Sequence, residues 1–272
     1  MMRALTLALA IGAAVVFTSC SRENASSSPR LLLATTHTVE DSGLLDTLVT
    51  QFRADHPGVD LQVVVAGSGE VLTIARRGDV DVLLTHSPDD ERAFVTDGFG
   101  VARRPVMHNS FVLAGPSTDS AKAAAASTAV DAFTRIHASG QLFISRGDDS
   151  GTHRKEQSVW KAAGITPDAA HYLEAGAGMA DALRVASQKH AYILTDLATL
   201  LTLQDKTELE LLYQGDPVLR NDYSVIVVRN ARNGIAAELF ASWITSASVQ
   251  KRIAEFGRST VGRSLFIGDA VR

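Results

Sequence analysis

The chain has little cysteine, few aromatic residues and no large excess of either charge. Its 272 residues include one cysteine, Cys20, which excludes a disulfide within a single chain. Aromatic residues make up 6%, and 26 basic side chains stand against 30 acidic ones. Proteins that bind nucleic acid need a basic stripe against the phosphate backbone. The sequence therefore predicts no nucleic-acid partner, and its length suffices for one large or two modest α/β domains.

The amino terminus has the pattern of a secretion signal. Arg3 precedes an apolar run that ends in small residues directly before Cys20. The run is too short for a convincing membrane span, so a signal peptide over residues 1–19 is preferred to an anchor helix. The position of Cys20 resembles a bacterial lipobox, with Phe17 where Leu, Val or Ile is usual. We expect an exported protein in the periplasm or on the outer face of the cytoplasmic membrane, lipidated at Cys20 and anchored to the membrane only there.

After a serine-rich linker over residues 20–30, short apolar runs alternate with amphipathic stretches. The runs predict strands and the helical spacing of apolar residues predicts helices, in the order strand, helix, strand, helix, strand. This is a doubly wound pattern. The expected strands are 31–34, 61–65, 80–84, 142–144 and 191–194, and the expected helices are 44–52, 71–77, 179–190 and 236–256.

Two long segments are expected to cross between two α/β lobes. Residues 106–114 predict one long strand, and residues 222–228, rich in β-branched side chains, would carry the chain back. The first lobe is then 31–110 with 224–272, and the second is 111–223. The alanine-rich stretch 121–126 would open the second lobe as a helix surface. We expect a monomer.

Polar residues follow the predicted strands, where open α/β sheets bind ligands. Hydroxyl groups occur at Thr35 to Thr38 and at Ser68, and the loop 145–152 combines hydroxyls, glycines and Arg146. A tetrahedral dianion offers only acceptor oxygens, so it must be surrounded by N–H and O–H donors. Helix N-termini, hydroxyls and an arginine provide these donors. The sequence therefore predicts an oxyanion site in the cleft between the lobes.

Two other interpretations of this loop are open to the sequence. Arg146 in a lone Arg-Gly-Asp run would be a surface arginine paired with Asp148 or Asp149. The Ser150-Gly151-Thr152 run, which opens a helix directly after a strand, favours the anion instead. His153 and Glu156 could be metal ligands or an acid and base, but no second histidine completes a zinc motif and no nucleophile elbow surrounds Ser150. We expect no catalytic residue and no metal site.

The run from Ser145 to His153 resembles the signature of the tungstate-binding proteins of bacterial ABC transporters, in the phosphate-binding-protein-like superfamily. The resemblance covers nearly the whole mature chain, including 33–36, 41–46, 78–86, 106–109, 111–116, 176–179, 194–196 and 215–217. It implies a type II periplasmic binding protein that closes over its ligand. It also implies that a permease and its ATPase are the partners.

The resemblance places the oxyanion contacts on Arg146, Thr152, Ser68 and the Thr35 to Thr38 loop, and chemistry adds neighbouring donors. The predicted set is Thr35, Thr36, His37, Thr38, Ser68, Ser145, Arg146, Ser150, Gly151 and Thr152. His37 replaces a hydroxyl that the family usually carries. Its ring either donates to the anion or points away while its backbone N–H serves.

Tungstate is the expected ligand, molybdate and phosphate are the alternatives, and no cofactor is expected. Monohydrogen phosphate would need a carboxylate to accept its proton, a role open to Asp148 or Asp149. Tungstate carries no proton at neutral pH, so a facing carboxylate would repel it. The tungstate interpretation therefore predicts that both aspartates pair with Arg146 or cap the helix.

Overall fold

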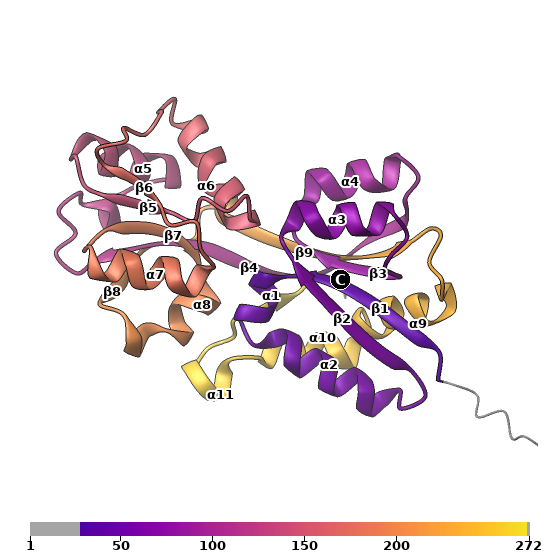
Figure 1. The fold of residues 1–272 in the computed structure, drawn as a ribbon. Helices are drawn as coiled ribbons and strands as arrows, with labels where there is room; N and C mark the ends of the chain where they lie inside the picture. The colour runs from indigo at the N-terminus through magenta and orange to yellow at the C-terminus, as the bar shows by residue number, and fades with distance from the viewer. Residues whose placement is uncertain (1–27, 271–272) are drawn as a thin grey trace, which may run out of the picture.

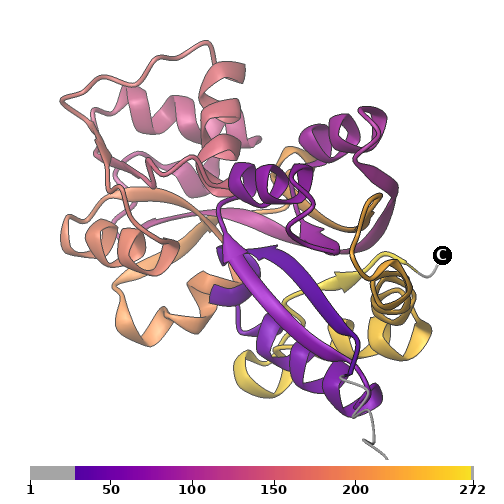
Figure 2. The same ribbon diagram turned by 45° about the vertical axis from the view of Figure 1, so that its right-hand side comes forward.

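The computed structural model describes residues 28–270, which form two α/β lobes (Figure 1). The predicted signal peptide over residues 1–19, the lipidation site Cys20 and most of the predicted linker lie outside the described residues. Within 28–270, none of the helices combines the length and the apolar character that a membrane crossing requires. The predicted two-lobed α/β architecture is confirmed, and the two lobes remain distinct in a second view (Figure 2).

Lobe 1 is a sheet with helices on both faces. Its strands lie in the order β2, β1, β3, β9 (Arg220–Val228) and β4 (Gly100–Pro116). Strand β1 is parallel to β2 and β3, and β9 is antiparallel to β3. Helices α2, α9 and α10 pack on one face of this sheet, and α3 and α4 pack on the other. The elements are β1 (Arg30–Thr36), α1 (His37–Asp41), α2 (Leu44–Asp55), β2 (Asp60–Ala66), α3 (Ser68–Arg76), β3 (Val82–Thr85), α4 (Pro88–Thr96), α9 (Gly234–Ile244), α10 (Ala247–Glu255), α11 (Arg258–Val261) and β10 (Ile267–Gly268).

Lobe 2 repeats the arrangement around a second group of strands. Strands β5, β6 and β7 are parallel, and β7 and β8 pair antiparallel with β4. Helices α5 and α6 cover one face and α7 and α8 the other. The elements are η1 (Ala123–Ala125), α5 (Ala129–Ala138), β5 (Phe143–Ser145), α6 (Gly151–Ala162), β6 (Tyr172–Glu174), α7 (Met179–Gln188), β7 (Tyr192–Asp196), α8 (Leu197–Thr202), η2 (Gln204–Lys206), β8 (Leu209–Tyr213) and η3 (Pro217–Leu219).

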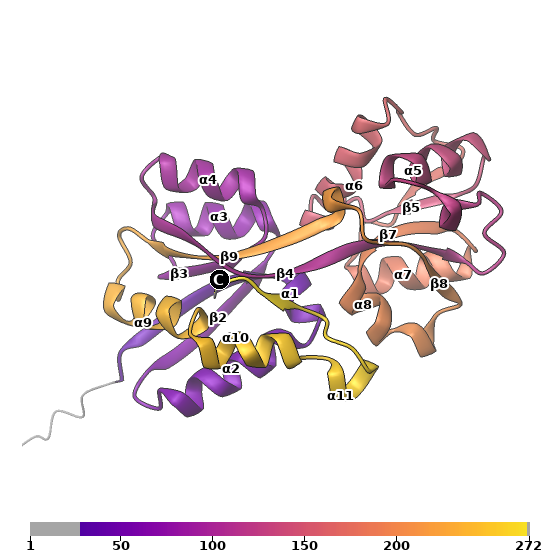
Figure 3. The ribbon, with the colours of Figure 1, turned by 180° about the vertical axis from the view of Figure 1, so that it is seen from behind.

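Two long strands join the lobes: β4 (Gly100–Pro116) and β9 (Arg220–Val228) lie side by side between them (Figure 3). As far as Ser110, β4 pairs with β9, and from Phe111 onward it pairs with β7 and β8. The C-terminal strand β10 also pairs with β4. Beside it, an Asp269 oxygen lies 2.7 Å from His108 Nδ1 and accepts a 3.0 Å hydrogen bond from Arg220. Residues 267–269 are thus attached to both crossing strands.

The helical structure predicted over 236–256 is confirmed except for a break at Thr245 and Ser246, so the segment forms two helices rather than one. Ser246 is extended, with φ −69° and ψ 150°, and its hydroxyl donates to the Trp243 carbonyl over 2.6 Å. Helix α9 therefore ends at Ile244, and Ser246 is the N-cap of α10, although the apolar periodicity continues across the break. Both helices bury most of their apolar side chains in the core of lobe 1, whereas Ile235 and Leu239 of α9 are exposed.

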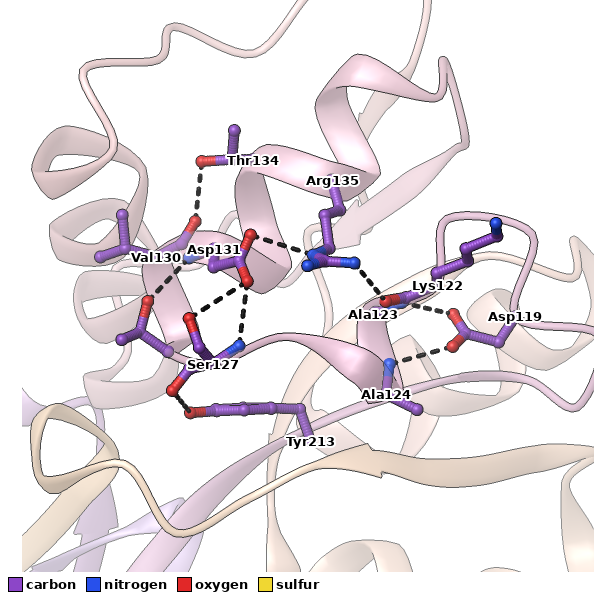
Figure 4. A network of polar contacts seen from close by, with 11 residues as sticks. Asp119, Lys122, Ala123, Ala124, Ser127, Val130, Asp131, Thr134, Arg135 and Tyr213 are labelled. Atoms are coloured by element: carbon purple, nitrogen blue, oxygen red, sulfur yellow. Dashed lines mark hydrogen bonds and ion pairs between the residues drawn. The ribbon is translucent and has the colours of Figure 1, made fainter.

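The alanine-rich stretch is also not the helix surface that we expected. It forms only the short turn η1, in which the Asp119 carboxylate accepts from the N–H groups of Ala123 and Ala124, both over 2.9 Å (Figure 4). Ala123 is fully buried. Arg135 of α5 then connects this turn to the start of its own helix, because it donates to the Lys122 carbonyl and to Asp131. A small side chain is needed for packing at Ala123, whereas Ala124 and Ala125 are exposed.

Candidate anion-binding site

The loop between β5 and α6 holds a buried arginine at the base of a helix. Gly147 and Asp149 both have left-handed backbones, with φ of 65° and 55°. The Asp148 carboxylate accepts from the Ser150 N–H over 3.2 Å, and the Ser150 hydroxyl caps α6 by accepting from the His153 N–H over 3.3 Å. These local bonds turn the chain sharply between strand and helix. The N-terminus of α6, with its partial positive charge, is thereby brought beside Arg146.

Arg146 is nearly inaccessible, with 2% of its surface exposed, yet only part of its guanidinium is bonded. One nitrogen, Nη2, donates to an Asp148 oxygen over 2.5 Å. The other two, Nε and Nη1, have no hydrogen-bond partner among residues 28–270. A buried donor without a partner is costly, and more so when it is charged. The arrangement therefore suits an anion that accepts from both free nitrogens.

Two threonine hydroxyls near Arg146 are likewise buried and lack a hydrogen-bond partner among the described residues. Thr36 at the end of β1 and Thr152 in the first turn of α6 are 2% and 1% exposed, and neither Oγ1 has a partner in the part of the chain described. Each hydroxyl can donate one hydrogen bond to an oxyanion. The two come from different lobes, so an ion that bonds to both would lie between them.

The strand ends of lobe 1 meet the start of α6. Thr36 is in register with Ala66, directly before the turn that leads into α3, and His86 directly follows β3. The backbone of Gly151 lies so close to the His86 ring that an added Cβ would be 2.2 Å from Cε1. The two helix N-termini, those of α3 and α6, therefore face the same region from opposite lobes.

The other predicted residues lie around this region with their side chains otherwise engaged. The Thr35 hydroxyl donates to the Leu84 carbonyl over 2.9 Å, and the Ser145 hydroxyl accepts from the Gly147 N–H over 3.3 Å. The His37 ring is half exposed and lies 3.4 Å from Glu40, so it points away from the cleft. Three more predicted positions, Thr38, Ser68 and Ser150, are buried. Where hydroxyls or rings are already bonded, a ligand contact would have to come from the backbone N–H.

The prediction for the two aspartates of the loop is only half right. Asp148 pairs with Arg146 as expected. Asp149 instead receives two bonds from Arg154, over 3.0 and 2.8 Å, although we expected it to pair with Arg146 or to cap the helix. The sequence did not indicate Arg154, because five residues of separation at a loop–helix junction specify no contact. Neither aspartate is left as a free acceptor facing the cleft.

His86 is a residue of this region that the sequence did not assign to the site. Its Nδ1 lies 2.9 Å from Asn221 Oδ1, whereas its Nε2 is buried without a partner among the described residues. Asn221 uses its own N–H groups on Asn109 and Tyr223, so the atom facing His86 is an acceptor and Nδ1 carries the proton. Burial lowers the pKa of His86 to about 4, which leaves the ring neutral. Asp81, Asp196 and Asp216, which also lie at the ends of strands or loops, accept from backbone N–H groups and have a structural role.

The catalytic or metal-binding pair considered from the sequence is not assembled. His153 uses Nδ1 to accept from the Asp149 N–H over 3.0 Å, and its residue is only partly buried. Glu156 instead points into lobe 2, where its carboxyl accepts from Trp160 Nε1 over 3.1 Å and from the Tyr172 hydroxyl over 2.7 Å. The two side chains do not bond to each other directly. Gln157 joins them instead, because its Nε2 lies 3.3 Å from His153 Nε2 and donates over 2.7 Å to the Tyr172 hydroxyl that donates to Glu156.

The buried carboxyl of Glu156 makes the free energy of unfolding depend on pH. Burial raises its pKa from 4.5 to about 7. Between these values the unfolded chain releases a proton that the folded chain keeps, so Glu156 costs stability progressively as the pH rises from about 4.5 to about 7. We expect wild type to lose on the order of 3 kcal/mol more than Glu156→Gln over this range. Urea unfolding of both proteins at pH 5 and pH 8 measures the difference, and parallel pH profiles would contradict the assignment.

Comparison with known proteins agrees with the fold and the loop. Residues 23–248 match the PBP superfamily domain. The tungstate-binding protein TupA of Peptoclostridium acidaminophilum is 39% identical over 248 residues, covering 89% of this chain and 86% of the relative. The chain belongs to the TupA family of the PBP superfamily. Its fold is therefore the two-lobed type II periplasmic binding protein fold that the sequence resemblance implied.

Solved TupA-family structures have the same architecture. The tungstate-binding protein TupA from Desulfovibrio alaskensis G20 aligns with a TM-score of 0.77 at 37% identity, over 89% of this chain and 99% of that one. A structure described as the tungstate ABC transporter from Geobacter sulfurreducens aligns with a TM-score of 0.74 at 38% identity, over 84% of this chain and 98% of that one. The similarity thus extends through both lobes.

Proposed function

We propose that this TupA-family chain is the exported solute-binding protein of an ABC importer, that it captures tungstate between its lobes, and that it is not an enzyme. The observation that carries the proposal is a group of buried donors from both lobes that have no partner among residues 28–270: Thr36 Oγ1, Arg146 Nε and Nη1, and Thr152 Oγ1. The names of two relatives, a tungstate-binding protein and a tungstate ABC transporter, support tungstate as the ligand and an ABC importer as the route of uptake. The permease and its ATPase are then the partners, and we propose a monomer lipidated at Cys20.

The donors supply enough free energy for tight capture only together with backbone N–H groups. Hydrogen bonds to a charged group contribute about 1.5–3 kcal/mol each, so the four side-chain donors give roughly 6–12 kcal/mol. Association and ordering cost roughly 4–15 kcal/mol, and nanomolar affinity requires a net of about −12 kcal/mol. We therefore propose that the N-termini of α3 and α6 contribute donors at Ser68, Gly151 and Thr152. The Thr35 to Thr38 segment would do the same from β1 and α1.

The engaged carboxylates favour an ion without a proton. Asp148 is bonded to Arg146 and Asp149 to Arg154. Asp196, whose pKa is raised by burial, accepts from the Thr199 N–H and hydroxyl over 2.9 and 2.6 Å. Monohydrogen phosphate would require one of these groups to leave its present partner, whereas tungstate and molybdate would not.

Closure over the ion requires the two lobes to move about the crossing strands. We propose the limits 31–110 with 224–272 for lobe 1 and 111–223 for lobe 2. The change of pairing partner in β4 between Ser110 and Phe111 supports this division. Movement at that point would separate Thr36 from Arg146 and Thr152, and would admit the ion.

Calorimetric competition among tungstate, molybdate, sulfate and phosphate tests the proposal. We expect tungstate and molybdate to bind at least about a hundredfold more tightly than phosphate. Monohydrogen phosphate would bury either its own proton without an acceptor or a carboxylate drawn away from its present partner, and each costs about 3 kcal/mol or more. Sulfate, which is smaller, should also bind weakly. Tight binding of phosphate alone would refute the choice of ion, and binding of none of the four would refute the function.

A further inference from the structure

Arg154 of α6 connects the anion-binding loop of lobe 2 to lobe 1. Its Nε and Nη2 donate to the two oxygens of Asp149 in the loop, over 3.0 and 2.8 Å. Its remaining nitrogen, Nη1, donates to Asp90 Oδ2 over 2.7 Å. Asp90 lies in the first turn of α4, which belongs to the opposite lobe. One guanidinium therefore uses all three nitrogens, two within its own lobe and one across the cleft.

The contact within lobe 2 holds an unfavourable backbone. Asp149 has φ 55°, a left-handed conformation that is uncommon for a residue with a side chain. The fork from Arg154 fixes both carboxylate oxygens of Asp149, and the Asp149 N–H donates to His153. The loop conformation that buries Arg146 and the position of the Arg154 side chain therefore depend on each other.

The start of α3 also approaches the Arg154 guanidinium closely. A Cβ built on Gly69 would be 3.0 Å from Arg154 Nη2 and 4.0 Å from an Asp149 oxygen. Gly69 directly follows Ser68, a predicted ligand residue. The guanidinium thus meets lobe 1 at α3 as well as at α4, on the rim of the proposed ion site.

We infer that Arg154 is a positioning residue that holds the lobes closed: it is fixed by Asp149 of the anion-binding loop and bonds to Asp90 of the opposite lobe. The inference rests on the proposed function. Because α4 and α6 are in different lobes, the bond to Asp90 exists only in the closed form. Its free energy therefore shifts the balance between open and closed forms and slows release of the ion, without stabilising either lobe alone.

The size of the effect follows from the exposure of the pair. Arg154 and Asp90 are 38% and 46% exposed, which places their bond among surface ion pairs of modest strength. Arg154 is already ordered by Asp149, so little side-chain entropy is lost when it bonds to Asp90. A roughly two- to fivefold effect on the lifetime of the complex is expected at low salt. The effect should largely disappear near 1 M salt, where exposed charges are screened.

Asp90→Asn is the informative variant, because it removes the charge across the cleft and leaves the Asp149 fork in place. We expect tungstate to dissociate about two- to fivefold faster, with a nearly unchanged association rate, as measured by rapid filtration and metal analysis. Arg154→Gln should show the same loss plus that of the loop contact. In the double variant, Asp90→Asn should add nothing further. Arg184→Gln, which breaks a somewhat more exposed surface pair with Asp181 inside α7, is the control and should release tungstate at the wild-type rate.

A measurement without ligand keeps this inference separate from the proposed function. Spin labels at the exposed positions Asp46→Cys in lobe 1 and Lys189→Cys in lobe 2, with Cys20 replaced by serine, report the distance between the lobes. Asp90→Asn should shift the ligand-free distances toward longer values at low salt. Unchanged distances and an unchanged release rate would overturn the role of Arg154, even if wild type binds tungstate. If wild type binds none of the oxyanions, the proposed function fails, and the distances alone decide the role of Arg154.

Discussion

Replacing Arg146 by glutamine is expected to lower the affinity for tungstate by roughly 10²- to 10⁴-fold in calorimetry. The variant loses the buried positive charge and the two nitrogens, Nε and Nη1, that have no partner among the described residues. Each hydrogen bond to an anion contributes about 1.5–3 kcal/mol, so two give this range. Asp148 would also lose its positively charged partner and repel the incoming dianion, so we expect the loss of affinity to lie toward the upper end of this range.

A second variant separates the lost donors from the exposed carboxylate. Adding Asp148→Asn to Arg146→Gln removes the repulsion, and part of the affinity should return. Arg135→Gln breaks another arginine–aspartate pair of lobe 2, within α5, and should bind tungstate as wild type does. If Arg146→Gln folds, as judged by urea unfolding, and still binds tungstate tightly, the site is not where we place it.

Gly151→Ala is expected to weaken tungstate binding by about ten- to hundredfold while leaving the fold intact. Its Cβ would meet His86 Cε1 at 2.2 Å and Nδ1 at 2.8 Å. The ring is buried and bonded to Asn221, so it can yield only by giving up that bond. Overpacking of this kind costs about 1–3 kcal/mol, and the lobes can avoid it by staying apart. The cost then falls on closure, and unfolding should be unaffected, because alanine is the better helix former.

The glycine that begins α7 provides the control. A Cβ on Gly178 would meet no atom within 4 Å, so Gly178→Ala should bind tungstate normally. Combining Gly151→Ala with His86→Ala removes the obstructing ring and should restore part of the lost affinity. Normal binding by Gly151→Ala alone would show that the lobes close without bringing His86 and Gly151 together.

The sequence predicts the parts of the fold that depend on local pattern. Leu31 and Leu33 lie in a short apolar run, and Leu44, Leu48 and Phe52 recur at helical spacing, so β1 and α2 could be predicted. The break between α9 and α10 could not, because apolar spacing continues past Ser246. Helix α4 was missed although Ser87-Pro88 is a good helix start, since its apolar content is low. Tertiary packing of Phe94 decides that helix.

The sequence predicts the chemistry of the site better than its geometry. The strand–loop–helix order placed Arg146 and Thr152 at the base of α6, and their unpartnered buried atoms agree with donors for an anion. It could not show that the Thr35 hydroxyl bonds to a carbonyl, that His37 turns outward, or that Asp149 takes Arg154 as its partner. Each depends on which segments lie side by side after folding. His86 was missed for the same reason, since it and Gly151 belong to different lobes and lie side by side only in the folded chain.

The attachment of the last strand to β4 has a consequence for how the chain folds during export. The core of lobe 1 combines Leu31 and Leu33 near the beginning of the chain with Phe240, Ile253 and Phe266 near its end. The elements of lobe 2 are instead contiguous between β4 and β9. A chain that emerges amino terminus first therefore exposes one face of β1 and β2 until nearly all of it has crossed the membrane. Contacts of such long sequence separation form slowly, so we expect lobe 2 to fold first and lobe 1 to be completed last.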